Sequence, residues 1–179
     1  MGGLLSLSRA IDAVNEKVGR LADWAVLLAC LISAGNASIR YLFSLSSNAF
    51  LEIQWYLFAV TVLLGASYTM KMNEHVRVDL IYGSVSDRAR LWIDAFGIVV
   101  FLLPVTIFLT YLCWPFFTVS FLGNELSQNA GGLILWPAKL LLPLGFFLLT
   151  LQGISELIKR IGGILGVIEV DLKYEKPLQ

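Results

Sequence analysis

The apolar residues of this chain are concentrated in four long runs separated by short polar segments. Each run exceeds the roughly 20 residues that an α-helix needs to cross a bilayer. None shows the alternating polarity of the roughly ten-residue strands in a membrane β-barrel. The runs cover residues 21–45, 49–70, 91–121 and 133–158. The pattern therefore predicts an all-α integral membrane protein, a single membrane domain with four transmembrane helices.

The first 20 residues follow an amphipathic pattern. Apolar residues recur at alternating steps of three and four, and charged residues fill the other face, as in an amphipathic helix. The apolar positions are Leu4, Leu7, Ile11, Val14, Val18 and Leu21. We expect residues 1–20 to form a separate helix in the cytoplasmic interface of the membrane, with packing on a soluble partner as the alternative. Residues 161–179 are expected to form a cytoplasmic tail.

The composition agrees with a membrane protein. Hydrophobic residues make up 58% of the 179 residues and charged residues only 15%, against about 25% in soluble domains. The formal net charge is zero, so the charge balance gives no reason to expect a nucleic-acid partner.

The basic residues predict an orientation. Lys and Arg occur in the N-terminal segment, between the second and third runs, and after the fourth run. The connections at about 46–48 and 122–132 contain none. Because basic segments remain on the cytoplasmic side, both termini are expected in the cytoplasm. The tryptophans fall toward the ends of the runs, as aromatic belts require.

Two charged residues flank the first connection at similar depth. Arg40 precedes the connection by about six residues and Glu52 follows it by about four. An ion pair across this hairpin, or a shared polar network with Asn36 and Gln54, would satisfy both charges. The alternative is that each side chain reaches the outer surface separately.

Other polar residues in the runs suggest local pairs. Asp94 follows Arg90 by four residues, and Glu156 precedes Lys159 and Arg160 by three and four, so each acid can pair along one helix face. Lys139 enters the fourth run on the predicted outer side. It either extends outward to water or meets an acid on a partner subunit. Gly65, Ala66, Ser67 and Gly97 are candidate points of close helix approach, either within this bundle or against another subunit.

The stretch "KMNEHVRVDL", residues 71–80, contains the single histidine of the chain, His75. It lies in the predicted cytoplasmic connection. No second histidine and no nearby cysteine accompany it, so a metal or haem site lacks ligands. We expect His75 to form local hydrogen bonds, and we expect no cofactor.

Residues 39–92 resemble the small membrane subunit, the DctQ type, of tripartite ATP-independent periplasmic (TRAP) transporters. The family pattern has an Arg-aromatic pair closing the first helix, here Arg40-Tyr41. It has an acid near the start of the second helix, here Glu52 followed by Trp55. A His-x-x-x-Asp signature then follows, here His75 and Asp79, and the third helix starts with basic residues. The usual acid pair near the second helix is reduced here to Glu52 with Gln54 nearby.

The resemblance implies a non-catalytic subunit of the bacterial inner membrane. In that family a large membrane subunit carries sodium and substrate, a periplasmic binding protein delivers an organic carboxylate such as a 2-oxo acid or dicarboxylate, and the small subunit enlarges the scaffold. Arg40, Glu52, Gln54, Trp55, His75, Asp79 and Lys139 are then structural or interface candidates, and membrane lipids are further partners. Two other functions stay open: a small dimeric exporter using Glu52, and a membrane anchor of a redox enzyme.

Overall fold

Four long apolar helices form the computed structural model, which describes residues 2–74 and 85–168. They are α1 (Gly2–Phe43), α2 (Asn48–Met72), a third helix in three parts, and α6 (Trp136–Ile164). The third helix consists of α4 (Asp87–Gly97), the π-helical turn η1 (Ile98–Leu102) and α5 (Leu103–Leu122). Each of the four is long and apolar enough to cross a membrane. The all-α, four-helix membrane fold predicted from the sequence is confirmed.

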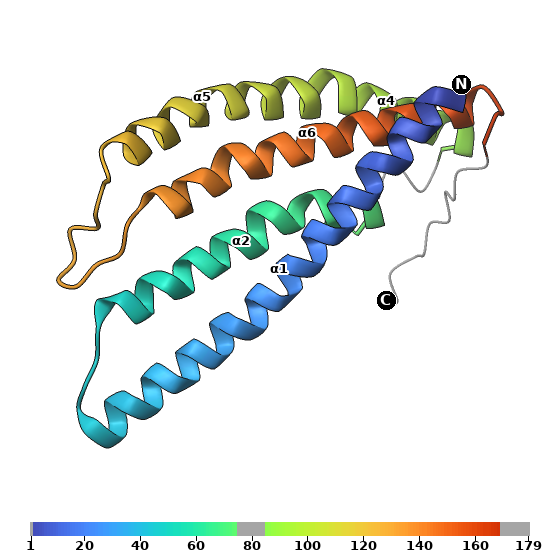
Figure 1. Cartoon of the computed structure of the whole chain (residues 1–179). Helices are drawn as coiled ribbons and strands as arrows, with labels where there is room; N and C mark the ends of the chain where they lie inside the picture. Colours follow the sequence, from blue (N-terminus) through green and yellow to red (C-terminus); the bar gives the residue numbers. More distant parts are fainter. Residues whose placement is uncertain (1, 75–84, 169–179) are drawn as a thin grey trace.

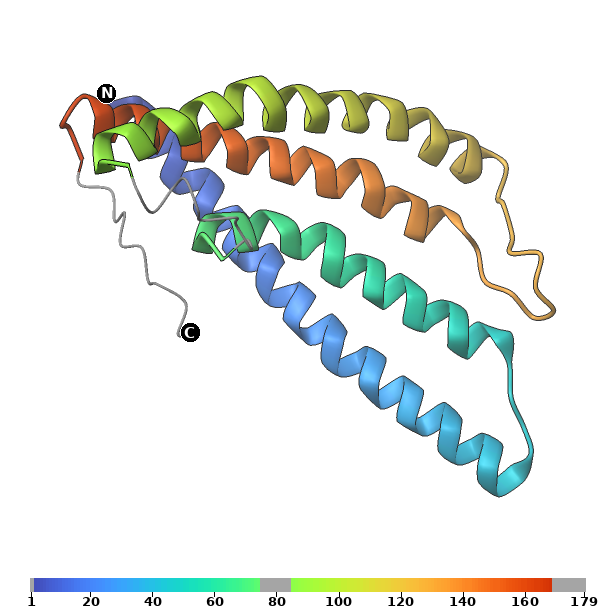
Figure 2. The same ribbon diagram turned by 180° about the vertical axis from the view of Figure 1, so that it is seen from behind.

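The helices lie side by side in the order α5, α6, α2, α1 (Figures 1 and 2). α6 is central, because it contacts α5, α2, α4 and the N-terminal part of α1. The connections 44–47 and 123–135 lie at one end of the row, and the N-terminus and the end of α6 lie at the other (Figure 1). The two connections without basic residues therefore share one end, as the predicted orientation requires.

α1 is one continuous helix of 42 residues. The expectation that residues 1–20 form a separate helix is therefore wrong. No proline interrupts the chain between the amphipathic segment and the first apolar run, so the backbone continues without a break. At about 1.5 Å per residue, such a helix is about twice as long as the bilayer core, which is about 30 Å thick.

The amphipathic segment packs with its small and polar residues inward. Ser8 and Asn15 are buried against α6, whereas Leu4, Leu7 and Val14 are about half exposed. The contact stripe of α1 continues at helical spacing through Gly19, Ala22 and Ala25. In a membrane, apolar side chains gain little by leaving lipid, so small residues and hydrogen-bonding groups form the helix contacts.

The π-helical turn precedes Pro104. The Leu103 N–H donates to the carbonyl oxygen of Ile98, five residues back. Proline has no N–H to donate four residues back, and its ring clashes with that carbonyl group. A single wide turn just before proline relieves this conflict. The third helix consequently continues through Pro104 without ending.

Glycines mark the closest helix contacts, but not those expected. A Cβ atom at Gly145 of α6 would lie 2.8 Å from the carbonyl oxygen of Leu63 in α2, and one at Gly19 of α1 would lie 2.5 Å from Cγ of Tyr68. Gly65 leaves ordinary space to Ala22, and no atom lies within 4 Å of a Cβ built at Gly97. Gly65 therefore contacts α1 at an ordinary van der Waals distance, and Gly97 marks no close approach within the described bundle. Contact of either residue with another subunit stays a prediction.

Candidate functional site

Glu52 holds the long connection between α5 and α6 in place. Its carboxylate accepts hydrogen bonds from the hydroxyl of Ser127, from Nδ2 of Asn129 at 2.8 Å and from the backbone N–H of Leu133 at 2.7 Å. The residue is only 5% exposed. α2 presents this acid in its second turn, and the connection folds back over it. Its three acceptor contacts fix the connection to the start of α2.

The predicted ion pair between Arg40 and Glu52 is wrong. The carboxylate is occupied by the long connection, and the side chain of Arg40 forms no ion pair or hydrogen bond with a residue in 2–74 or 85–168. Arg40 does lie beside Asn36 and Gln54, since all three line one cavity between α1 and α2. The Gln54 amide, however, donates to the Phe50 carbonyl oxygen of its own helix.

Lys139 has an acidic partner within the chain. It donates a hydrogen bond to Glu125, which lies in the long connection, and its Nζ lies 4.2 Å from the ring centre of Phe116. This ammonium group holds the pKa of Glu125 below its ordinary value. The sequence suggested open water or an acid on another subunit as the environment of this ammonium group; the structure gives it an acid of the same chain, Glu125. A buried stem, an ion pair and an aromatic ring together stabilise a cation at this end of α6.

Of the three remaining predicted residues, Trp55 lies in the described part of the chain. Trp55 is 73% exposed on the outside of the row, where an aromatic ring suits a membrane interface or a partner. His75 and Asp79 lie outside the described residues.

The opposite end of the molecule contains a polar network between α1 and α6. Nδ2 of Asn15 donates to Oε1 of Gln152 at 2.7 Å, and Nε2 of Gln152 donates to Asp12 at 2.9 Å. Ser155 also donates to Asp12 at 2.8 Å and lies 2.7 Å from the hydroxyl of Ser8. Asn15, Gln152 and Ser155 have no exposed surface. The amphipathic segment is thus joined to α6 by the side chains of Ser8, Asp12 and Asn15.

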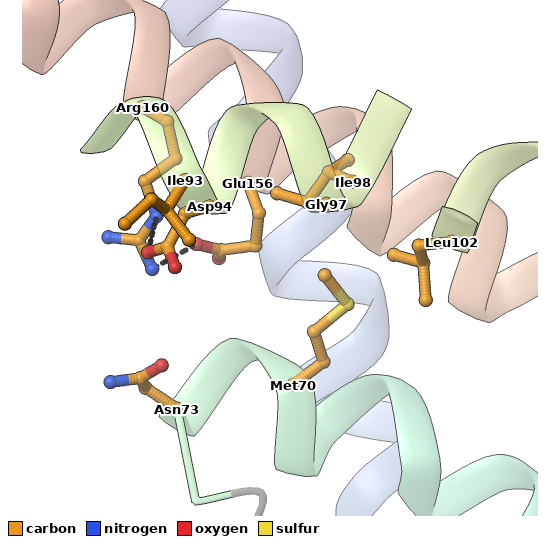
Figure 3. Close-up of a pocket in the computed structure, with 9 residues that line it drawn as sticks. All are labelled: Met70, Asn73, Ile93, Asp94, Gly97, Ile98, Leu102, Glu156 and Arg160. Carbon is orange, nitrogen blue, oxygen red and sulfur yellow. Dashed lines mark ion pairs between the residues drawn. The ribbon is translucent and has the colours of Figure 1, made fainter. Parts of the chain in front are cut away.

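Charged residues extend this network toward α4. Lys159 pairs with Asp12 and with Glu156, each at 2.7 Å. Arg160 lies 3.2 Å from Asp94 of α4 and 3.6 Å from Glu156 (Figure 3). The predicted pairs along α6 are confirmed. For Asp94 the sequence suggested Arg90 as partner. The structure pairs Asp94 with Arg160 of α6, and it pairs Arg90 with Asp87 of its own helix.

A cavity of about 350 Å³ adjoins these charges. Figure 3 shows Asp94, Glu156 and Arg160 on one side and Met70 and Asn73 of α2 on the other. Because each acid drawn here has a basic partner, the arrangement stabilises helix contacts.

The sequence contained a signal for this network. Ser8, Asp12 and Asn15 follow one another at steps of four and three, as do Gln152, Ser155 and Lys159 at steps of three and four. Each set shares one helix face. The pattern alone does not show that the two faces meet, since the residues lie about 140 positions apart. No group of three or more His, Cys, Asp or Glu side chains within residues 2–74 and 85–168 is placed to hold a metal ion.

The comparison with protein families identifies the class. Residues 29–163 match the family model described as "Tripartite ATP-independent periplasmic transporters, DctQ component". No curated protein and no solved structure matches the chain.

The match covers more than half of the chain, so the protein belongs to the DctQ family. It is a small multi-pass membrane subunit of the TRAP transporter class. It is a transporter component and not an enzyme. The resemblance found in residues 39–92 is confirmed.

Proposed function

We propose that this chain is the scaffold subunit of a sodium-coupled, binding-protein-dependent importer of an organic carboxylate, such as a 2-oxo acid or a dicarboxylate. Its partners are the large TRAP membrane subunit, which carries sodium and substrate, and a periplasmic binding protein. Membership of the DctQ family supports the assignment.

The distribution of charge supports a scaffold. Residues 24–39, 53–70, 95–122 and 140–155 contain no Asp, Glu, Lys or Arg. A transport path at the middle of the membrane normally has convergent polar groups or broken helices. Here the charged networks lie toward the two ends of the helices. Ion coupling is therefore assigned to the large subunit.

The lateral surface of the helix row supports a large membrane partner. Phe58, Phe101, Phe108 and Tyr111 are all more than half exposed. Lipid tails are as apolar as these side chains, so a partner helix gains by van der Waals packing rather than by a hydrophobic effect. A row open on both faces offers a broad area for such packing.

The proposed location is the bacterial inner membrane, with the N-terminus cytoplasmic and the connections 44–47 and 123–135 periplasmic. In a variant without native cysteines, Ser47→Cys and Asn129→Cys should react with an impermeant maleimide added outside, and Glu74→Cys should not. If only Glu74→Cys reacts, the proposed orientation is wrong and the opposite one holds.

Reconstitution tests the function. Proteoliposomes would contain this chain alone, the large subunit alone, or both, each with the binding protein and an inward sodium gradient. Carboxylate uptake is expected for the pair only. Uptake by this chain alone contradicts the scaffold role, and full uptake by the large subunit alone shows that the scaffold is dispensable.

A further inference from the structure

A second cavity, of about 500 Å³, lies between α1 and α2 near the 44–47 connection. Both views show the two helices diverging toward this end (Figures 1 and 2). The cavity combines polar and apolar walls. Its lining consists of Ser33, Asn36, Ala37, Arg40 and Tyr41 from α1 and Leu51 and Gln54 from α2.

Arg40 brings an unpaired positive charge to this cavity. The only acid between residues 24 and 73 is Glu52, and its carboxylate is bonded to the long connection. No described residue in 2–74 or 85–168 pairs with the guanidinium. A guanidinium group presents parallel N–H donors that match the oxygens of a phosphate or carboxylate. The cavity therefore has a donor set for an anion.

Asn36 supplies a second, independent indication of a ligand. It lies one turn before Arg40 on α1, is only 9% exposed, and its Oδ1 has no hydrogen-bond partner in the described chain. Buried polar atoms almost always have partners. A bound molecule with a hydroxyl or ammonium group beside its anionic group would satisfy this acceptor.

The surroundings favour a lipid over a side chain from another protein. The cavity lining includes Tyr41, which is 89% exposed. The next two residues along the chain, Leu42 and Phe43, are 68% and 66% exposed. They lie at the end of an apolar helix, where aromatic rings meet the lipid headgroups. The volume is within the range of small-molecule sites, about 300–1,000 Å³. A single carboxylate side chain would fill only a small part of it.

We propose that this cavity binds the phosphate-bearing headgroup of a glycerophospholipid. Arg40 donates to the phosphate oxygens, and Asn36 accepts from a donor on the headgroup. The apolar wall at Leu51 contacts the first part of the acyl chains. The site belongs to this chain and does not depend on the proposed transport function.

Lipid binding to the purified full-length chain tests the proposal. The probes are phosphatidylglycerol, diacylglycerol with the same acyl chains, and inorganic phosphate, measured by native mass spectrometry from detergent micelles. Phosphatidylglycerol should bind, diacylglycerol should not, and millimolar phosphate should not displace the lipid. Arg40→Gln should weaken binding about tenfold, as expected for loss of a charge-assisted contact. Arg40→Lys, which keeps the charge, should retain most of it.

Arg9→Gln is the matched control, because Arg9 is an exposed arginine at the other end of the same helix. It should leave the lipid bound. Equal binding by wild type and Arg40→Gln, or equal losses with Arg9→Gln, would overturn the site. If diacylglycerol binds as well as phosphatidylglycerol, the cavity recognises only the apolar part of the lipid and the proposal fails. If phosphate displaces the lipid, the ligand is a free anion and not a lipid. If the complex with the large subunit carries no lipid here and Arg40→Gln weakens the complex, an acid of that subunit is the ligand and the proposal fails.

Discussion

Replacing Gly145 by alanine should drive α6 and α2 apart. A Cβ atom at this position would lie 2.8 Å from both Cβ and the carbonyl oxygen of Leu63, and 3.1 Å from its carbonyl carbon. Real Cβ atoms do not approach other heavy atoms so closely. Most of the obstructing atoms belong to the backbone of α2, so no side-chain rotation removes the conflict. One or both helices must move.

The size of the effect follows from two opposing terms. Alanine in place of a helical glycine gains up to about 1 kcal/mol of helix propensity. Overpacking a tight contact costs about 1–3 kcal/mol. Gly35→Ala is the matched control, because no atom lies within 4 Å of a Cβ built there. Both variants share the propensity gain, so the difference between their free energies of unfolding should be about 1–3 kcal/mol.

The measurement is SDS-induced unfolding of the purified chain, followed by tryptophan fluorescence. The unfolding constant of Gly145→Ala should exceed that of Gly35→Ala by roughly 5- to 150-fold, since 1.4 kcal/mol is a factor of ten. Far-UV circular dichroism would show that both variants remain helical. Equal stability of the two variants would refute the close contact between α6 and α2.

Three further predictions concern the polar contacts at the two ends. Glu52→Gln should speed hydrogen exchange of the Leu133 amide, because a glutamine amide group accepts fewer of the three bonds. Gln152→Ala should lower the free energy of unfolding by about 2 kcal/mol, because its three hydrogen bonds, to Asn15, Asp12 and Glu156, are lost, and each contributes about 0.6 kcal/mol in a membrane. The lowered pKa of Glu125 stabilises the folded protein at neutral pH, and this contribution should disappear as the pH falls through the folded-state pKa below 4.5.

Each of these predictions has a control. Glu74→Gln removes an exposed acid at the other end of α2 and should leave Leu133 exchange unchanged. Gln54→Ala removes a glutamine that bonds only within its own helix, so a loss equal to that of Gln152→Ala would contradict the inter-helix network. Glu125→Gln should reduce the loss of stability between about pH 7 and pH 3, and the remainder comes from other paired carboxylates that are protonated in the same range. An undiminished loss would contradict the contribution of Glu125.

Fold class and membrane helices could be predicted from the sequence, because hydrophobic length depends on local composition alone. The family could be predicted from short motifs around Arg40 and Glu52. The partners of these residues could not. Their distances from the connection place Arg40 and Glu52 at similar depth, but depth does not fix the direction in which a side chain points from its helix. A connection more than 70 residues further along the chain provides the partners of Glu52.

The same distinction explains the N-terminal segment and Lys139. The amphipathic period of residues 4–21 was visible in the sequence, but the buried positions are Ser8, Ile11 and Asn15, whereas Leu4, Leu7 and Val14 of the apolar face are about half exposed. Periodicity defines two faces and does not say which one meets protein, because in a membrane the outside is apolar too. The partner of Lys139 similarly could not be predicted, because only the folded connection brings Glu125 to it. The sequence by itself determined the four apolar helices, because hydrophobic length depends on near neighbours, but it did not show that α1 continues unbroken from the amphipathic segment. Only the tertiary structure decided the pairing of polar groups, since that depends on which helix faces come together.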